Sequence, residues 1–152
     1  MGLSIVNYGP SFKDAFRDLN YQWISEYFKL EESDRKMLEN PQGYILDEGG
    51  AILIALHNES PVGTCALIKM GHQVFELAKM AVAPNMQGKR IGFELGMAAV
   101  KKAEELGALK LYLETNSILK PALALYKKLG FREVTGVSSP YHRCNVQMEL
   151  QL

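Results

Sequence analysis

The chain has 152 residues, 47% of them hydrophobic and 22% charged, and its 17 basic side chains balance its 17 acidic ones. This length and composition are typical of one globular domain, here residues 1–152, that buries its own core. The zero net charge argues against a dedicated nucleic-acid binder, and no apolar run reaches about 18 residues, the length of a membrane span. Because Cys65 and Cys144 are far apart and no secretory signal is recognisable, we expect a cytoplasmic protein.

The first quarter of the chain predicts a short strand followed by two helices. The strand covers residues 4–8, and the spacing of Ser11 and Asp14 is typical of a capping box that starts a helix. Apolar residues in this helix recur every three or four positions, which predicts one core-facing stripe: Phe12, Phe16, Leu19, Trp23 and Tyr27. A second helix over residues 31–38 ends before Asn40-Pro41, because the residue before a proline avoids helical geometry.

Strands and helices then alternate to the end of the chain. Three apolar, partly alternating runs predict an antiparallel meander: residues 51–56, 62–70 and 73–82. A helix that Gly107 closes joins the run at 73–82 to a strand at 109–115, so these two strands are expected to be parallel neighbours. A last helix runs from Pro121 to Gly130, and two strands complete the chain, at residues 131–136 and 146–152.

The order β-α-α-β-β-β-α-β-α-β-β predicts an α/β (α+β) fold with a mixed, mostly antiparallel sheet and helices on both faces. Within it, residues 82–92 connect a strand to a helix N-terminus, where unpaired N–H groups and a partial positive charge attract phosphates. Gly88 and Gly92 let a ligand approach the backbone, and Lys89 and Arg90 add positive charge. A plain strand-to-helix turn with solvated cations has the same spacing, and the segment is neither a P-loop nor a Rossmann fingerprint.

Two motifs resemble those of the GCN5-related N-acetyltransferase (GNAT) superfamily. Residues 87–92, Q-G-K-R-I-G, are similar to the family's Q/R-x-x-G-x-G/A signature, although Arg90 stands where the family usually has its middle glycine. Residues 122–131, A-L-A-L-Y-K-K-L-G-F, resemble the family's A-x-x-L-Y-x-K-x-G-F segment. The motifs lie at the family's separation, and the elements between them match as well.

The resemblance implies an acetyl-coenzyme A (acetyl-CoA)-dependent transferase that acetylates a primary amine of a small molecule or a peptide directly, without a metal. It implies that the family's strand bulge turns backbone N–H groups toward the thioester, and that Asn116 replaces an asparagine the family has where this chain has Leu119. The implied cofactor-binding residues are Met80, Val82, Gln87, Gly88, Lys89, Arg90, Ile91, Gly92, Asn116, Ala122 and Tyr126.

Two residues are the candidates for acid–base catalysis. The resemblance implies that the Tyr126 phenol protonates the departing thiolate, although the residue also lies on an apolar helical stripe and could be a core tyrosine. Strand alternation places Glu76 on an apolar face, where burial would raise its pKa and make it a better base. Pairing of Glu76 with Lys69 or Arg143 is the structural alternative, and a covalent route through Cys144 is a minor one.

The acceptor is expected between the first two helices and the loop before the last strand. The resemblance places four residues there, with Arg143 able to hold a carboxylate: Trp23, Tyr27, Tyr141 and Arg143. Trp23 and Tyr27 could equally be packing residues. A non-catalytic acyl-CoA-binding module is the alternative function and a nucleotide-binding domain a more distant one. No metal is expected because the histidines lack metal-ligand spacing, and a homodimer is left open.

Overall fold

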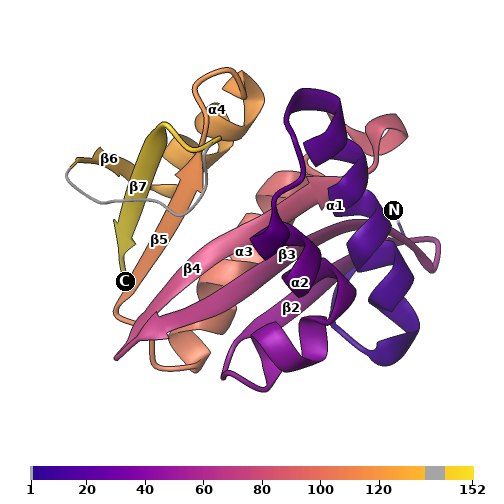
Figure 1. Cartoon of the computed structure of the whole chain (residues 1–152), viewed down its shortest axis with the longest axis horizontal. Helices are drawn as coiled ribbons and strands as arrows, with labels where there is room; N and C mark the ends of the chain where they lie inside the picture. Colours follow the sequence, from indigo (N-terminus) through magenta and orange to yellow (C-terminus); the bar gives the residue numbers. More distant parts are fainter. Residues whose placement is uncertain (1, 136–142) are drawn as a thin grey trace.

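The computed structural model of the protein describes residues 2–135 and 143–152, and Figure 1 shows its course. Its strands and long helices follow the predicted order: β1 (Leu3–Asn7), α1 (Lys13–Tyr27), α2 (Glu32–Glu39), β2 (Ala51–His57), β3 (Ser60–Gly71), β4 (Val74–Val82), α3 (Ile91–Glu105), β5 (Lys110–Thr115), α4 (Lys120–Leu129), β6 (Arg132–Val134) and β7 (Val146–Gln151). Three short helical turns are added: η1 (Pro10–Phe12), η2 (Gln42–Leu46) and η3 (Pro84–Met86). In the described residues, no helix is long and apolar enough to cross a bilayer.

The strands form one sheet in the order β1-β2-β3-β4-β5-β7-β6. All neighbouring pairs are antiparallel except β4 and β5, which are parallel as the crossover helix predicts. That parallel pairing is short: it joins Val74, Phe75 and Glu76 to Lys110, Leu111 and Tyr112 and no residues beyond them. Figure 1 shows that β4 and β5 then diverge. The sheet is therefore opened at its centre, between the two strands that carry most of the predicted site.

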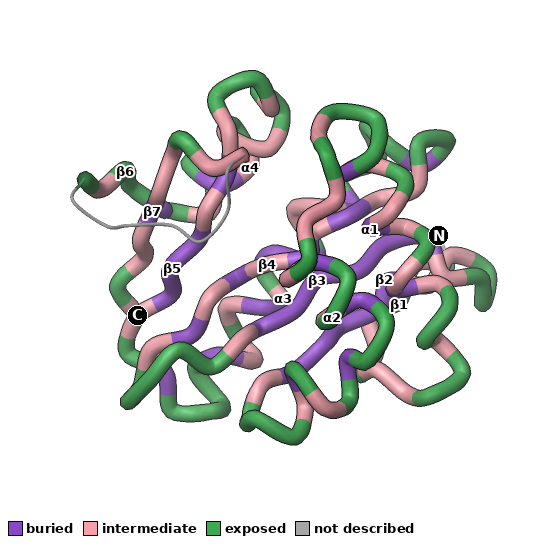
Figure 2. Tube along the Cα trace, in the orientation of Figure 1, coloured by how far each residue is buried: buried purple, intermediate pink, exposed green. Residues whose placement is uncertain are grey.

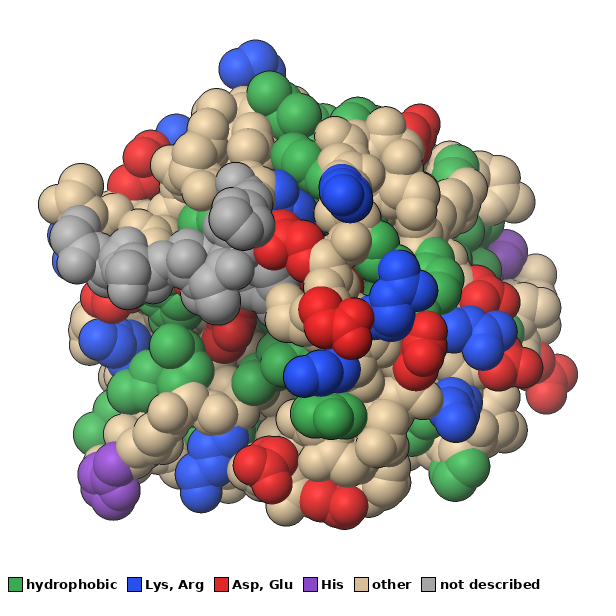
Figure 3. All heavy atoms as spheres, in the orientation of Figure 1, with side chains coloured by type: hydrophobic (Ala, Val, Ile, Leu, Met, Phe, Trp, Pro, Cys, Tyr) green, Lys and Arg blue, Asp and Glu red, His purple; other side chains and the backbone are tan. Residues whose placement is uncertain are grey.

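Helices cover both faces of the sheet, and each face has its own hydrophobic core. On one face α3 and α4 pack on the central strands through residues such as Leu95, Ala99 and Tyr126. On the other face, Phe16 and Ile24 of α1 and Leu38 of α2 belong to a second core that includes Ile54 of β2 and Ala66 of β3. Figure 2 shows the buried stretches along the central strands and the exposed turns around them. On the face in Figure 3, acidic and basic side chains are intermixed, in keeping with the zero net charge.

The start of the first helix differs from the sequence prediction. Helix α1 begins at Lys13, and no side chain caps its N-terminus, so the expected capping box of Ser11 and Asp14 does not form. Instead, Pro10–Phe12 make a 3-10 turn that leads directly into the helix. The capping box lies at α2, where Glu31 and Asp34 each bond the other's backbone N–H.

The buried face of α1 also differs from the predicted apolar stripe. Phe16, Asn20 and Ile24 are buried, whereas Tyr27 is 53% exposed. Asn20 can occupy the core because its amide is satisfied: Nδ2 donates to the Phe16 carbonyl at 2.9 Å and to Thr64 Oγ1 at 3.2 Å. This buried hydrogen-bonding residue rotates the helix, and Trp23 is left at the edge of the core.

Strand β4 carries the bulge that the resemblance implied. Ala78 pairs with Ala66 and Ala81 with Thr64, so Lys79 and Met80 together face one residue of β3. Lys79 has a left-handed backbone, with φ of +53°, which is rare for a residue with a side chain. Thr64 Oγ1 donates to the Lys79 carbonyl at 3.0 Å and helps to hold this conformation. The bulge lies beside the opening between β4 and β5.

Candidate active site

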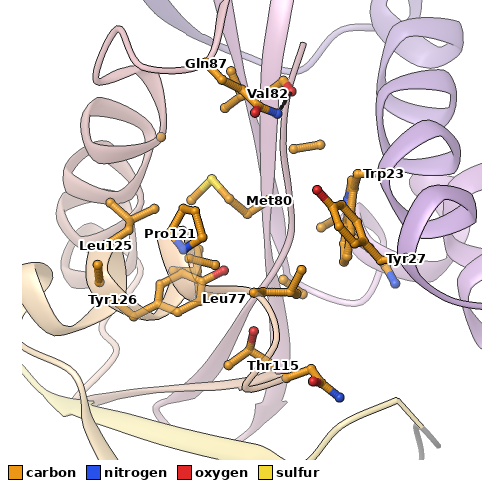
Figure 4. Close-up of a pocket in the computed structure, with 18 of the residues that line it drawn as sticks. Trp23, Tyr27, Leu77, Met80, Val82, Gln87, Thr115, Pro121, Leu125 and Tyr126 are labelled. Atoms are coloured by element: carbon orange, nitrogen blue, oxygen red, sulfur yellow. Dashed lines mark hydrogen bonds between the residues drawn. The ribbon is translucent and has the colours of Figure 1, made fainter. Parts of the chain in front are cut away.

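A cavity of about 550 Å³ lies where β4 and β5 diverge. Its walls come from α1, β4, the turn before α3, the end of β5 and α4, and Figure 4 shows Trp23 and Tyr27 facing Tyr126 across it. Most of the sequence-predicted site residues line this one cavity: Trp23, Tyr27, Glu76, Met80, Val82, Gln87, Gly88, Arg90, Ile91, Gly92, Asn116, Ala122, Tyr126 and Arg143. Lys89 is exposed outside it, and Tyr141 lies outside the described residues.

The turn before α3 presents a helix N-terminus to the cavity. Gly88 has φ of +82° and Arg90, the residue before the helix, φ of +65°, so both have left-handed backbones. The Gln87 side chain donates from Nε2 to the Val82 carbonyl at 3.3 Å and ties the turn to β4 (Figure 4). Gly92 packs so close to Leu125 that an added Cβ would lie 3.3 Å from it. The first residues of α3, whose N–H groups have no partner within the helix, therefore line the cavity without a bulky side chain at Gly92.

Two cations lie near this helix N-terminus. The Arg90 guanidinium lies 4.9 Å from the centre of the Phe93 ring, and Lys128 Nζ lies 5.3 Å from it. Both residues line the cavity, so charged side chains reinforce the partial positive charge of the helix end. This end of the cavity is suited to an anion such as a diphosphate.

Tyr126 projects from α4 and belongs both to the core and to the cavity. Its ring packs edge-on against Phe131, with 6.1 Å between centroids, and its hydroxyl points toward β4 (Figure 4). Burial raises the pKa of Tyr126 to about 12, so the phenol stays protonated at neutral pH. The two sequence interpretations, core tyrosine and proton donor, are thus compatible in one position.

Glu76 lies on the opposite face of β4 from the buried Phe75 and Leu77, and it lines the cavity. Burial raises its pKa to about 7, and the negative charge of Glu114 adds to this, whereas Lys79 and Arg143 oppose it. The alternative ion pairs with Lys69 or Arg143 are not formed within the described residues. A carboxyl group that titrates near neutral pH is suited to accept a proton from an amine.

A buried ionic cluster, which we call the Asp34 cluster, lies beside the β4 bulge. Asp34 Oδ1 accepts from Lys79 Nζ at 2.7 Å and from Arg143 Nη2 at 2.6 Å, and its Oδ2 accepts from Arg143 Nη1 at 2.6 Å. Glu31 is 3.3 Å from Arg143. Burial favours the neutral acid, but the bonds from Arg143 and Lys79 outweigh it and lower the pKa of Asp34 to about 2. Burial lowers the pKa of Lys79, and the negative charge of Asp34 and its hydrogen bond with Lys79 oppose this shift.

The Asp34 cluster corrects the role expected for Arg143. Both Nη atoms of its guanidinium are bound to Asp34, so it is engaged by the protein's own carboxylates and not placed as an open anchor for a substrate carboxylate. Neither Asp34 nor Lys79 was identified from the sequence. Two features of the sequence could have pointed to Asp34 and Lys79: the E-x-x-D spacing at residues 31–34 and the presence of a lysine within an apolar strand.

Asn116 and the two cysteines have structural contacts of their own. Asn116 lines the cavity, but its Nδ2 donates to the Arg143 carbonyl at 2.6 Å and its Oδ1 accepts from Ile118 N at 3.0 Å. Cys65 is fully buried, and burial raises its pKa to about 12, so it is a poor nucleophile. Cys144 reaches the cavity, and its thiol donates to the Val146 carbonyl at 3.5 Å.

The described part of the chain contains no group of three or more His, Cys, Asp or Glu side chains that could hold a metal ion. The cavity combines three features that could take part in chemistry: a helix N-terminus with cations beside it, the protonated phenol of Tyr126, and the carboxyl group of Glu76, whose pKa lies near 7.

A sequence profile of the Acetyltransferase (GNAT) family matches residues 17–131, and the chain belongs to this family. It is 38% identical over 72 residues to the uncharacterised N-acetyltransferase YjgM of Escherichia coli, covering 47% of this chain but only 43% of that protein. It is 30% identical over 138 residues to the uncharacterised N-acetyltransferase C1271.07c of Schizosaccharomyces pombe, covering 88% of this chain and 82% of that protein.

Solved structures have the same fold. A GNAT-family acetyltransferase from Staphylococcus aureus superposes with a TM-score of 0.89 at 24% identity, over 98% of both chains. A Bacillus subtilis acetyltransferase solved in complex with CoA superposes with a TM-score of 0.75 at 24% identity, over 99% of both chains. At these identities the superpositions establish the architecture, and the chemistry has to be argued from the residues of this chain.

Proposed function

We propose that the protein is an N-acetyltransferase that uses acetyl-CoA as co-substrate and transfers the acetyl group directly to a primary amine. The observation that carries the proposal is one cavity that joins three parts: the N-terminus of α3, the Tyr126 hydroxyl and the Glu76 carboxyl group. The family to which the chain belongs supports it, as do N-acetyltransferases among its relatives and CoA in the B. subtilis structure.

The α3 end of the cavity is the proposed site for the CoA diphosphate. Backbone N–H groups of the turn at residues 87–92 bind it, and Arg90 adds a positive charge. The pantetheine arm then runs along β4, where Met80 and Val82 follow the bulge. A bulge leaves backbone N–H groups unpaired in the ladder, and these are the proposed donors to the thioester carbonyl.

The proposed chemical step needs one proton acceptor and one proton donor. Glu76, with its pKa raised to about 7, is ionised in an adequate fraction at neutral pH and takes a proton from the ammonium group, directly or through water. The neutral amine attacks the thioester carbon, and the tetrahedral oxyanion is held by backbone N–H groups. The C–S bond breaks and the sulfur takes a proton from Tyr126, while the attacking nitrogen gives up its second proton, which returns Tyr126 to the phenol through water. Amide and free CoA are the products, and the proton on Glu76 is released to solvent.

Thiol release from acetyl-CoA across a panel of primary amines tests the proposal. Tyr126→Phe should lower kcat about 100-fold, the low end for loss of a general acid, and should leave acetyl-CoA affinity nearly unchanged. Tyr44→Phe is the matched control, since Tyr44 is 45% exposed and outside the cavity. Acetyl-CoA binding without thiol release on any amine would favour a non-catalytic acyl-CoA-binding module. ATP binding as tight as acetyl-CoA binding would favour a nucleotide-binding domain.

Four further statements belong to this proposal. Direct transfer is favoured over a route through Cys144, because the thiol donates its hydrogen bond to the neutral Val146 carbonyl, and this bond does not activate it as a nucleophile. A cytoplasmic location is proposed because both cysteines are free thiols, which fits a reducing compartment. We also propose that residues 1–152 act as one domain and that the acceptor is a small molecule or a peptide.

A further inference from the structure

The two ends of the cavity have opposite charge. Arg90 and Lys128 lie at the α3 and α4 end, where both flank the Phe93 ring. At the other end the charged groups are those of the Asp34 cluster together with Glu76 and Glu114. The cavity is thus polarised along its length.

Among the residues that the structure describes, the acidic end has more carboxylates than cations. Lys79 and Arg143 supply two positive charges, and Asp34 and Glu31 already take these up within 3.3 Å. Two further carboxyl groups, Glu76 and Glu114, line the cavity. The charge of Glu114 reaches Glu76 strongly enough to raise its pKa. The described residues therefore give this end a surplus of negative charge.

Aromatic side chains line the same cavity as these carboxyl groups. Trp23, Tyr27 and Phe28 line the cavity from the end of α1, and the Trp23 and Phe28 rings pack edge-on with 6.4 Å between centroids. Trp23 Nε1 donates to Asn20 Oδ1 at 3.2 Å, and this bond orients the indole. Aromatic faces attract ammonium groups, and they also pack on apolar bodies. Aromatic rings and carboxylates that line one cavity are together suited to a cation.

We infer that the acceptor is a primary amine without an acidic group, bound as a cation between Glu76 and Glu114 on one side and Trp23 and Tyr27 on the other. The inference rests on the proposed function and names its substrate class. Amines that carry a carboxylate are disfavoured, because Glu76 and Glu114 repel it and Arg143, the nearby cation that could receive it, is held by Asp34. Selectivity is thus set by charge, not by the length of the amine.

Binding to the protein saturated with CoA tests this without turnover. Calorimetry compares two matched pairs that differ by one carboxylate: tyramine with tyrosine, and 1,5-diaminopentane with lysine. The member without the carboxylate should bind about tenfold more tightly in each pair, as expected for like-charge repulsion in a partly buried site. Equal or tighter binding of tyrosine and lysine overturns the inference, and so does binding of none of the four compounds.

Glu114→Gln should reduce this preference to about threefold or less, because one of the two repelling charges is removed. Glu149→Gln is the matched control: Glu149 lies on the neighbouring strand β7, is bonded to Lys110 at 3.2 Å and does not line the cavity. Glu149→Gln should leave the preference unchanged. If Glu114→Gln also leaves it unchanged, the role given to Glu114 is overturned. Selective binding without acetylation would refute the proposed function alone and leave the charge selectivity standing.

Discussion

The two ends of the cavity are built in different ways. At the α3 end, the turn at residues 87–92 is contiguous in sequence, is exposed over residues 87–90, and uses the backbone of a helix N-terminus. At the acidic end, side chains meet from distant parts of the chain: Asp34 lies 45 residues from Lys79 and 109 from Arg143. The first end is local structure, whereas the second exists only after the fold has assembled.

The two ends also differ in how strongly their charges interact. Arg90 and Lys89 are exposed, so their charges are screened by water and salt. Asp34 is fully buried, and the side chain of Lys79 is 3% exposed, so their attraction is strong and its loss is costly. Substitutions in the Asp34 cluster should therefore act mainly on stability, and those at the α3 end mainly on ligand binding.

The largest expected effect comes from Asp34→Asn. The amide keeps the shape of the carboxylate but leaves the charges of Lys79 and Arg143 without their shared partner in the protein interior. Removing one member of a buried ion pair lowers the free energy of unfolding by about 3–5 kcal/mol, and urea titration measures this loss. The β4 bulge at Lys79 should loosen as well, because its left-handed backbone is held partly by this pair.

Asp18→Asn is the control, since the Asp18 side chain is 64% exposed in its pair with Arg17 and should cost less than about 0.5 kcal/mol. Acid sharpens the test. The pKa of Asp34 is lowered from 3.8 to about 2, so its contribution is complete above about pH 4 and is lost as pH falls toward 2. The gap between wild type and Asp34→Asn should close over this range. A gap that stays constant would contradict the role of the ion pairs.

The contrast between the two ends explains how much could be predicted from the sequence. Strand and helix order, the parallel pairing of β4 and β5, and the turn at residues 87–92 depend on local patterns and connection rules, and all were predicted. Tyr126 and Glu76 were found because they stand in a motif and in a strand alternation, and both line the cavity. Their catalytic roles stay predictions.

The Asp34 cluster could not be predicted, because no local pattern links α2, β4 and Arg143, which lies three residues before β7. An E-x-x-D spacing signals a capping box, but not that Asp34 is also shared by two cations. The buried face of α1 was missed for a similar reason. Asn20 is placed in the core by a hydrogen bond to Thr64 on β3, and a polar residue weakens any periodic pattern of apolar ones.

Glu76→Gln tests the acidic end through its chemistry, and its expected effect is second in size. In the wild type, kcat/KM should rise as pH increases through about 7, where Glu76 loses its proton. The variant should lack this rise and be about 100-fold slower at pH 8, as expected for loss of a general base. Glu114 from β5, Lys79 from β4 and Arg143 before β7 all act on this titration, so Glu114→Gln should move it to lower pH.

The pH dependence of stability in Glu76→Gln should be opposite in direction to that of Asp34→Asn. The pKa of Glu76 is raised from 4.5 to about 7, so its favourable contribution is complete below about pH 4.5 and lost as pH rises through 7. Glu76→Gln removes this loss, and its stability relative to wild type should therefore increase between pH 5 and pH 8. Urea titrations at both pH values measure it, with Glu149→Gln as control. A pH-independent difference would contradict burial of an ionising Glu76.

The smallest expected effects concern Arg90, where the α3 end combines a charge with a strained backbone. Both Arg90→Gly and Arg90→Ala remove the guanidinium, so acetyl-CoA should bind about three- to tenfold more weakly to either, and less so in high salt. They differ in the backbone, since φ is +65° and only glycine adopts it without strain. The free energy of unfolding should therefore be about 1 kcal/mol higher for Arg90→Gly than for Arg90→Ala.

Calorimetry and urea titration of this pair separate the two contributions at one residue. Equal stability of the two variants would mean that the left-handed conformation at residue 90 carries no strain. Wild-type affinity in Arg90→Gly would mean that the backbone N–H groups hold the diphosphate without help from this charge. Because both variants alter one exposed residue, neither should disturb the Asp34 cluster, and the pH dependence of stability that Asp34 and Glu76 set should be the same in both.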